Sequence, residues 1–347
     1  METTCFSDNI KTIPNNNLLL SIIVPVYNVE KYIHASVESI YKQGLDESSF
    51  EVIIVNDGTK DRSMEEIQDI IISHTNITVI NQTNQSLSVA RNNGIAAAKG
   101  KYILMPDSDD LLIENSLPLL LEKALTTEAD LVVADFVEMT DEEINKIGTI
   151  SQKEPIIQEK SGERLFLEDL NPRQCYVWRT LFRKDFLLNE KISFVPGIRY
   201  QDVPFTHECY LKAKKCLRVS WLLNIYRRGH ESATSSFNKK KAHDLCIAIA
   251  STWKLNTIEG LSDDVKQKLN DNLFASFSLL IYFMLYGIKD CNERNEIFCF
   301  LRKQVPNLNF TNGLKQKITS FTFNHFPLFY YITRVALKRF TPKPNFG

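Results

Sequence analysis

The sequence lacks the features that mark several specialised classes of protein. Its seven cysteines form no CxxC pair and no other paired spacing, so a disulfide framework and a zinc site are both disfavoured; they are Cys5, Cys175, Cys209, Cys216, Cys246, Cys291 and Cys299. Reduced thiols in a cytoplasmic protein are therefore expected. No uninterrupted apolar run is long enough to cross a bilayer, and the first residues contain no basic segment leading into an apolar core. We therefore expect neither a transmembrane helix nor a signal peptide.

An excess of one charge is also missing. The 347 residues contain 41 Lys and Arg against 42 Asp and Glu, so the molecule as a whole does not have the charge of a nucleic-acid-binding protein. With 44% hydrophobic and 24% charged residues, the composition is that of a globular protein. A chain of this length is too long for one ordinary core. We expect either one large domain with a C-terminal addition or two domains.

What the first part of the chain does contain is a regular alternation of two apolar patterns. Short runs rich in β-branched residues predict buried strands at 18–28, 50–58, 77–82, 101–106 and 129–136. Helical spacing between them predicts one helix after Asn28 as its N-cap and before Gly44, and others at about Ser63–Ser73, at 86–99 ending at Gly100, and at about Leu117–Ala124. This alternation indicates an α/β fold with a Rossmann-like, mostly parallel sheet and flanking helices.

Three polar motifs, PVYN, NDG and DSDD, follow predicted strands directly. Ligands of such sheets bind at the carboxyl ends of the strands, so we expect the three motifs to line one crevice. In the last motif, Asp107, Asp109 and Asp110 occupy three of four positions although like charges repel. Such a cluster is either a solvated turn or a site for a divalent cation, which turns the repulsion into ligand charge.

The order and spacing of five longer segments resemble those of family 2 of the inverting nucleotide-sugar glycosyltransferases, which have the GT-A fold: SIIVPVYNVEKYI, VIIVNDGTKDRS, NQSLSVARNNGIAAAKGKYILMPDSDD, VWRTLFRKDFL and RYQDVPF. The chain looks most similar to bacterial members that build cell-surface polysaccharides. The likeness extends from Leu18 to about Ser236. It implies a GT-A nucleotide-sugar-binding and catalytic domain over residues 18–236, followed by a C-terminal helical region over residues 237–347.

The resemblance implies a nucleotide site at the first strand ends. Asp57 corresponds to the family residue that accepts a hydrogen bond from uracil. The opposite wall of the slot corresponds to Pro25, Val26 and Tyr27. Arg91 corresponds to the family arginine near the nucleotide, and as a cation it could also meet the diphosphate. From position alone, Asp57 could instead shape a turn, Tyr27 could lie in the core, and Arg91 could lie on a solvated helix face.

The DSDD motif matches the DxD motif of the family. By resemblance, Asp109 binds Mn²⁺ or Mg²⁺, and Asp107 reaches the ribose or the metal. In an extended backbone these two residues face the same side, so Ser108 points away from the cation, although it is still counted with the nucleotide site. Asp110 is expected to cap the next helix. A solvated acidic turn is the alternative for the whole cluster.

The resemblance places the catalytic base in GIRYQDVPF. Asp202 corresponds to the aspartate that removes the proton of the acceptor hydroxyl. The residue before it is Gln201, where the family usually has Glu. This chain therefore lacks the second carboxylate of the motif but keeps the aspartate that corresponds to the base. Asp202 could also cap the helix that follows. Trp178 corresponds to a residue near the donor or acceptor sugar, where an indole can stack on a pyranose, or else it anchors the core.

The segment YRRGHESATSS lies where family members carry a loop that folds over the diphosphate. Arg227, Arg228 and His230 are therefore candidates for phosphate contact, and His230 could reach the metal. A lone histidine in a loop is more often simply solvated.

The chain beyond residue 237 changes to helical patterns with apolar faces. Its end combines aromatic and basic side chains, which suit the cytoplasmic surface of a membrane: Phe321, Phe323, Phe326, Phe329, Tyr330 and Tyr331 with Lys315, Lys317, Arg334, Lys338 and Arg339. Packing on the preceding helices or a homodimer contact is the alternative.

Together these observations predict a metal-dependent inverting glycosyltransferase of the bacterial cytoplasm or the inner membrane face. It would move a hexosyl or N-acetylhexosaminyl group from a UDP-sugar to a glycan or lipid-linked acceptor. Two alternatives remain open. One is a catalytically silent nucleotide-sugar-binding subunit of a polysaccharide assembly complex. The other is a haloacid-dehalogenase-type phosphatase, although DSDDLL lacks the threonine expected after its nucleophile.

Overall fold

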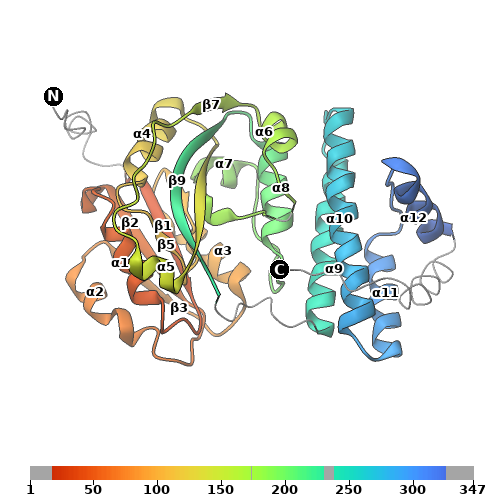
Figure 1. Ribbon diagram of the computed structural model, residues 1–347, viewed down its shortest axis with the longest axis horizontal. Coiled ribbons are helices and arrows are strands. Elements are labelled where there is room, and N and C mark those ends of the chain that lie inside the picture. Colours follow the sequence, from red (N-terminus) through yellow and green to blue (C-terminus); the bar gives the residue numbers. More distant parts are fainter. Residues whose placement is uncertain (1–17, 173, 230–237, 326–347) are drawn as a thin grey trace.

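The computed structural model describes residues 18–172, 174–229 and 238–325, and a mixed β-sheet organises the first two of these ranges (Figure 1). Within the described residues the sheet has nine strands. They are β1 Leu20–Val26, β2 Phe50–Asn56, β3 Ile77–Asn81, β4 Tyr102–Leu104, β5 Leu111–Leu112, β6 Leu131–Thr140, β7 Ile157–Lys160, β8 Thr180–Arg183 and β9 Cys216–Arg228. All five predicted strands are therefore present, and the sequence patterns missed only strands that are short or lie beyond residue 155.

The described helices flank this sheet and then continue beyond it. They are α1 Ile33–Tyr41, α2 Gln68–Ser73, α3 Leu87–Ala97, α4 Leu117–Thr127, α5 Asp141–Lys146, α6 Gly162–Glu168, α7 Lys184–Asn189, α8 Asp202–Lys212, α9 Lys239–Lys254, α10 Asp263–Gly287, α11 Cys291–Gln304 and α12 Gly313–His325. Short 3₁₀ turns occur at Glu47–Ser49, Glu65–Ile67, Val177–Arg179 and Leu255–Thr257. None of the described helices is both long and apolar enough to cross a bilayer.

The strand order is β3-β2-β1-β4-β8-β6-β9-β5, with β7 on β9. Strands β3, β2, β1 and β4 are parallel to one another, as the βαβ pattern predicts. Strand β8 then pairs antiparallel with both β4 and β6, whereas β6 and β9 are parallel. The sheet is thus parallel where it carries the predicted motifs and mixed beyond them.

Side chains from the two faces of the sheet enter two separate cores. From β1, Leu20, Ile22 and Val24 point to the core that α1, α2 and α4 cover. Ile23 points to the other core, which α3, α6 and α8 cover and which extends into α9–α12. Strand β1 is therefore buried on both sides, which explains its nearly continuous apolar sequence.

Two predicted helix boundaries are wrong. Asn28 does not cap α1, because it adopts a left-handed conformation (φ 55°) and its backbone N–H donates to Thr59 Oγ1; the helix begins only at Ile33. Helix α3 ends at Ala97, before Gly100. A Cβ at Gly100 would lie 2.5 Å from the backbone carbon of Leu20. Glycine is needed there because the chain passes close to β1.

The predicted C-terminal helical region is present from α9 to α12, on one side of the sheet domain (Figure 1). It shares a continuous apolar core with α8. A buried hydrogen bond also joins the two parts: Asn272 Nδ2 of α10 donates to His207 Nε2 of α8 over 3.1 Å. Residues 230–237, between β9 and α9, and residues 326–347, with most of the predicted aromatic and basic segment, lie outside the described residues.

Candidate active site

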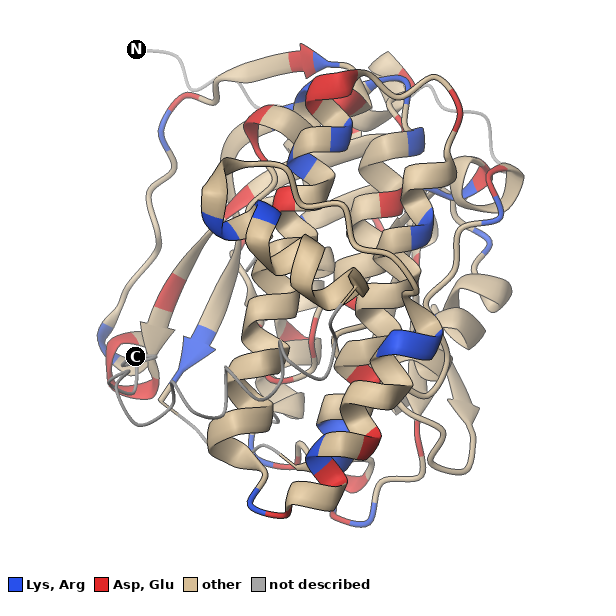
Figure 2. Cartoon of the chain, turned by 90° about the vertical axis from the view of Figure 1, so that its right-hand side faces the viewer, with Lys and Arg blue, Asp and Glu red and all other residues tan. Residues whose placement is uncertain are grey.

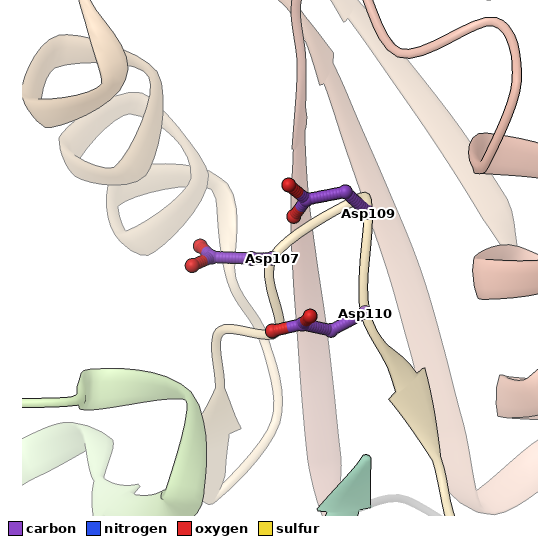
Figure 3. Close-up of side chains that lie close together, drawn as sticks. All are labelled: Asp107, Asp109 and Asp110. Carbon is purple, nitrogen blue, oxygen red and sulfur yellow. The ribbon is translucent and has the colours of Figure 1, made fainter. Parts of the chain in front are cut away.

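The three aspartates after β4 come together in one turn, called here the acidic turn (Asp107–Asp110). One carboxylate oxygen from each of Asp107, Asp109 and Asp110 lies within 4.8 Å of the others, and the three side chains extend to the same side of the turn (Figure 3). The turn has this shape because β4 ends at Leu104 and the chain reverses into β5 at Leu111. The predicted pair, Asp107 and Asp109, is thus brought together.

The predicted role of Asp110 as a helix cap is wrong. Its side chain is 2% exposed, and its Oδ1 accepts a hydrogen bond from the backbone N–H of Arg227 (2.8 Å). The next helix, α4, starts only at Leu117. Asp110 therefore belongs to the acidic cluster, where the hydrogen bond from strand β9 fixes its position.

The electrostatics of the cluster favour a bound cation. Burial, followed by the charges of Asp107 and Asp109, raises the pKa of Asp110 to about 9. Burial also raises the pKa of Asp107 to about 6, with Arg91 opposing the shift and Asp109 and Asp202 adding to it. In addition, Asp110 Oδ2 is buried without a hydrogen-bond partner. A site rich in carboxylate oxygens with an unused buried acceptor fits a hard divalent ion such as Mg²⁺ or Mn²⁺.

Arg91 lies behind the acidic turn. It projects from α3, is 2% exposed, and donates from its guanidinium to Asp107 Oδ1 over 2.5 Å. The guanidinium also lies 5.5 Å from the centre of the Phe194 ring. This burial disfavours the predicted direct contact of Arg91 with a diphosphate, because its guanidinium is paired with Asp107. The alternative of a solvated helix face is wrong.

Asp57, after β2, is 3% exposed and organises the loop that leads into α3. Its Oδ1 accepts from Gln82 Nε2 (2.7 Å) and from the backbone N–H of Gln85 (2.8 Å), and its Oδ2 accepts from that of Ser86 (3.0 Å). Ser86 has φ 99° and ψ 156°, a conformation that costs an L-residue free energy unless its surroundings enforce it. Asp57 therefore fixes a strained backbone beside the predicted nucleotide slot.

The other predicted residues of the nucleotide slot are buried, except for Tyr27. Pro25 and Val26 are buried in β1, paired with Val55 and Asn56 of β2. Tyr27, the next residue, is 41% exposed, so it is not a core residue. Ser108 is buried within the acidic turn. Of the predicted PVYN wall, only Tyr27 thus presents an accessible ring at a strand end.

Asp202 is the first residue of α8 and is half-buried. The charge of Asp202 helps to raise the pKa of Asp107. Burial raises the pKa of Asp202 itself, and Arg91 and the backbone N–H groups of residues 202 and 203 oppose that shift. These interactions indicate that the predicted base lies near the acidic turn, although 95 residues separate Asp202 from Asp107 in sequence. Gln201 is 4% exposed, and its Oε1 has no hydrogen-bond partner.

Trp178 lies in an aromatic cluster rather than on an open surface. It is 2% exposed. Its ring stacks on Tyr176 (4.8 Å between ring centres) and on Tyr226 (5.6 Å), and meets Phe136 edge to face (4.9 Å). The structure therefore favours the role of core anchor over that of a stacking platform for a sugar.

Arg227 supports the acidic turn from β9. Its Nε donates to the backbone oxygen of Asp109 over 2.8 Å, its guanidinium pairs with Asp141, and it lies over the ring of Tyr32. With 8% exposure, it is not arranged for the predicted phosphate contact. Arg228 is exposed and pairs with Glu138. His230 lies outside the described residues.

Asp141 is a site residue that the sequence analysis missed. It opens α5, whose start carries a complete capping box between Thr140 and Glu143. The T-x-x-E spacing is a sequence signal for this helix, but it does not reveal that Asp141 pairs with Arg227, 86 residues away.

Comparisons with known proteins identify a matching family and related sequences. The model of the family described as "Glycosyl transferase family 2" matches residues 21–186. The uncharacterized glycosyltransferase EpsJ of Bacillus subtilis is 34% identical over 226 residues, which are 62% of this chain and 63% of EpsJ. Glycosyltransferase GlyG of Streptococcus pneumoniae is 27% identical over 85% of this chain and 98% of its own length.

The fold has a solved counterpart. The structure of Staphylococcus aureus TarS residues 1–349 with UDP-GlcNAc superposes with a TM-score of 0.72 at 20% identity, over 92% of this chain and 91% of that one. The likeness includes the C-terminal helices and confirms the predicted GT-A-type α/β fold. The family model thus matches residues 21–186, a little under half of the chain, and the related sequences are named as glycosyltransferases, so the chain is similar to glycosyl transferase family 2.

Proposed function

We propose that the protein is a metal-dependent inverting glycosyltransferase that moves a sugar from a UDP-sugar to a hydroxyl group of a glycan or lipid-linked acceptor. The observation that carries the proposal is the acidic turn, where three carboxylates converge at a strand end beside Asp202. The relatives are named as glycosyltransferases, and TarS was solved with UDP-GlcNAc. The UDP-GlcNAc of the TarS structure supports an N-acetylhexosaminyl or hexosyl donor, and the motif resemblance supports a role in the synthesis of a cell-surface polysaccharide.

The nucleotide is bound at the ends of β1 and β2. The exposed ring of Tyr27 packs on the base. Asp57 accepts the N–H of uracil with the capacity left on Oδ2, which receives one hydrogen bond from the protein against two at Oδ1. This contact selects uracil over cytosine, because cytosine presents no ring N–H to a carboxylate.

Asp107, Asp109 and Asp110 hold a divalent cation, Mn²⁺ or Mg²⁺, with Arg91 and Arg227 fixing the turn from behind. Once bound, the cation supplies Lewis-acid stabilisation of the departing diphosphate. The two arginines restrict the rotamers of the turn, so the carboxylates are arranged before the ligand arrives. Such preorganisation lowers the cost of binding.

Asp202 acts as general base. In a single displacement with inversion, the base removes the proton of the acceptor hydroxyl as that oxygen attacks the anomeric carbon and the bond to the diphosphate breaks. Burial raises the pKa of Asp202, which makes it a stronger base than an exposed aspartate. Its position at the N-terminus of α8 fixes it relative to the acidic turn.

A two-stage experiment tests the proposal. Thermal unfolding with UDP, GDP and their sugars, with and without Mn²⁺, identifies the ligand because only a ligand of the folded state raises the melting temperature. UDP-sugar hydrolysis without acceptor is then measured for the wild type, for Asp109→Ala and for the surface control Asp264→Ala. We expect a Mn²⁺-dependent shift with UDP-sugars, hydrolysis by the wild type and the control, and none by Asp109→Ala.

Three results would contradict the proposal, each in its own way. Ligand-induced stabilisation without any hydrolysis would indicate a silent nucleotide-sugar-binding subunit. Release of inorganic phosphate from phosphomonoesters would indicate a phosphatase. Equal hydrolysis by Asp109→Ala and the wild type would remove the acidic turn from the mechanism.

A further inference from the structure

Helix α12 (Gly313–His325) carries apolar side chains on its exposed side as well as on its buried side. The buried side contains Thr319, Ser320 and Phe323, and Ser320 Oγ accepts a hydrogen bond from the backbone N–H of Phe310 (2.6 Å). Its opposite side exposes Leu314 (75%), Ile318 (52%) and Phe321 (57%). These three positions, at i, i+4 and i+7, form one stripe along the helix. A helix of a soluble domain normally keeps the side opposite the core polar, so a second apolar stripe on the exposed side of α12 is unusual.

Basic side chains border the stripe. Lys315 and Lys317 are both exposed, and at 100° per residue they fall on opposite flanks of the apolar stripe. The helix lies at the end of the molecule farthest from β1–β3 in Figure 1, on the side that faces the viewer in Figure 2. The three apolar side chains of the stripe and both lysines are exposed on this helix.

The charge of the whole C-terminal stretch has one sign. Residues 297–347 include eight Lys and Arg and neither Asp nor Glu, in a chain whose net charge is -1. The eight are Arg302, Lys303, Lys315, Lys317, Arg334, Lys338, Arg339 and Lys343. An anionic partner is thus favoured. A second copy of the same face is disfavoured, because it would bring two cationic surfaces together.

We propose that the stripe Leu314, Ile318 and Phe321, with its flanking lysines, is a docking surface for an anionic lipid membrane. The apolar side chains enter the boundary between headgroups and acyl chains, while the ammonium groups remain at the level of the lipid phosphates. This inference concerns where the enzyme works, and it does not depend on the donor or the acceptor proposed above.

Co-sedimentation of the full-length protein with lipid vesicles tests the surface. The vesicles consist of phosphatidylcholine alone or of phosphatidylcholine with phosphatidylglycerol. We expect binding to the anionic vesicles only, decreasing as salt is added because the headgroup attraction is screened. Neutralising either lysine, as in Lys315→Gln or Lys317→Gln, should weaken binding by about fivefold at low salt.

The apolar contribution has a matched control. The variant Leu314→Gln with Ile318→Gln should bind about tenfold or more weakly, since two aliphatic side chains no longer leave water. The control is Ile72→Gln with Leu188→Gln, at two positions of α2 and α7 whose exposures of 74% and 53% match those of the test positions. It should bind like the wild type. Circular dichroism and the UDP-dependent thermal shift verify that both variants fold, separately from lipid binding.

Several outcomes would overturn the inference. One is a lack of binding to anionic vesicles. Another is an equal effect of the two double variants. A third is a concentration-dependent dimer that only Leu314→Gln with Ile318→Gln abolishes, which would assign the stripe to a second copy of the chain.

Discussion

Replacing Asp110 with Asn should have opposite effects on the metal-free and the metal-bound protein. The change keeps the size of the side chain and an oxygen that can accept the hydrogen bond from the backbone N–H of Arg227. It removes a carboxyl group that must stay protonated or ionise in the acidic turn and places an amide N–H₂ where Oδ2 has no partner. The carboxylate oxygens of Asp107 and Asp109 lie within 4.8 Å of that of Asp110, so the partial positive charge of the amide reduces the repulsion in the turn.

The magnitude follows from the pKa of Asp110, which burial and its acidic neighbours raise to about 9. Because the unfolded chain titrates near the model value of 3.8, the folded state binds a proton that the unfolded state does not hold. Stability is therefore lost as the pH rises from about 4 to about 9. At pH 7 the penalty is about 4 kcal/mol. The Asp110→Asn variant escapes this penalty, so without metal it should be more stable than the wild type by up to that amount.

Urea unfolding at pH 7, with EDTA or with Mn²⁺, measures both effects. In EDTA the variant should unfold at higher urea than the wild type. With Mn²⁺ the wild type should gain more stability than the variant, because its third carboxylate is a ligand that an amide replaces poorly. The same change at half-buried Asp109 is the control: it should alter stability in EDTA little, yet also reduce the gain from Mn²⁺. A less stable Asp110→Asn protein in EDTA, or equal gains from Mn²⁺ in variant and wild type, would refute this reasoning.

Three further changes test other parts of the molecule. Asp202→Asn should lower kcat by about 10²–10⁴-fold with little change in UDP-sugar affinity by calorimetry; unchanged turnover would exclude it as the base. Burial lowers the pKa of His207 to about 4, so the wild type should lose about 3 kcal/mol of stability between pH 6.5 and 4. His207→Gln should lack that loss, and parallel pH curves from urea unfolding would contradict this. Gly94→Ala should lower the free energy of unfolding by about 1–3 kcal/mol in the same assay, because the new Cβ would lie 2.3 Å from Ile23 Cγ2. A variant as stable as the wild type would mean that β1 can shift to make room for the added methyl group.

Local patterns were sufficient for the part of the fold that carries the motifs. Strands β1–β4 alternate with helices over short connections, and the apolar runs alone locate them. The mixed half of the sheet was harder to foresee, because β8 has only four residues and pairs with β4 and β6 from distant parts of the sequence. Strand pairing over such separations leaves no periodic signal within either strand.

The same distinction applies to the candidate site. The DxD pair, Asp57 and Asp202 were found because each lies in a short motif. The contacts that support these residues could not be predicted from local motifs. Asp110 accepts a hydrogen bond from a residue 117 positions away, and Arg91 forms a buried ion pair with Asp107. Sequence gives the chemical type of a side chain, but burial decides whether an arginine meets a ligand or supports a neighbouring carboxylate.

Charge balance around the acidic turn connects these observations. The three aspartates of the turn and Asp202 are acidic, and among the described residues the cations bound to this turn are Arg91, which pairs with Asp107, and Arg227, which already pairs with Asp141. The site is therefore short of positive charge before any ligand arrives. A diphosphate would add negative charge to it, and neither arginine is exposed enough to compensate. We expect UDP to bind much more weakly in EDTA than with Mn²⁺, because a divalent cation provides the charge that the protein itself does not supply.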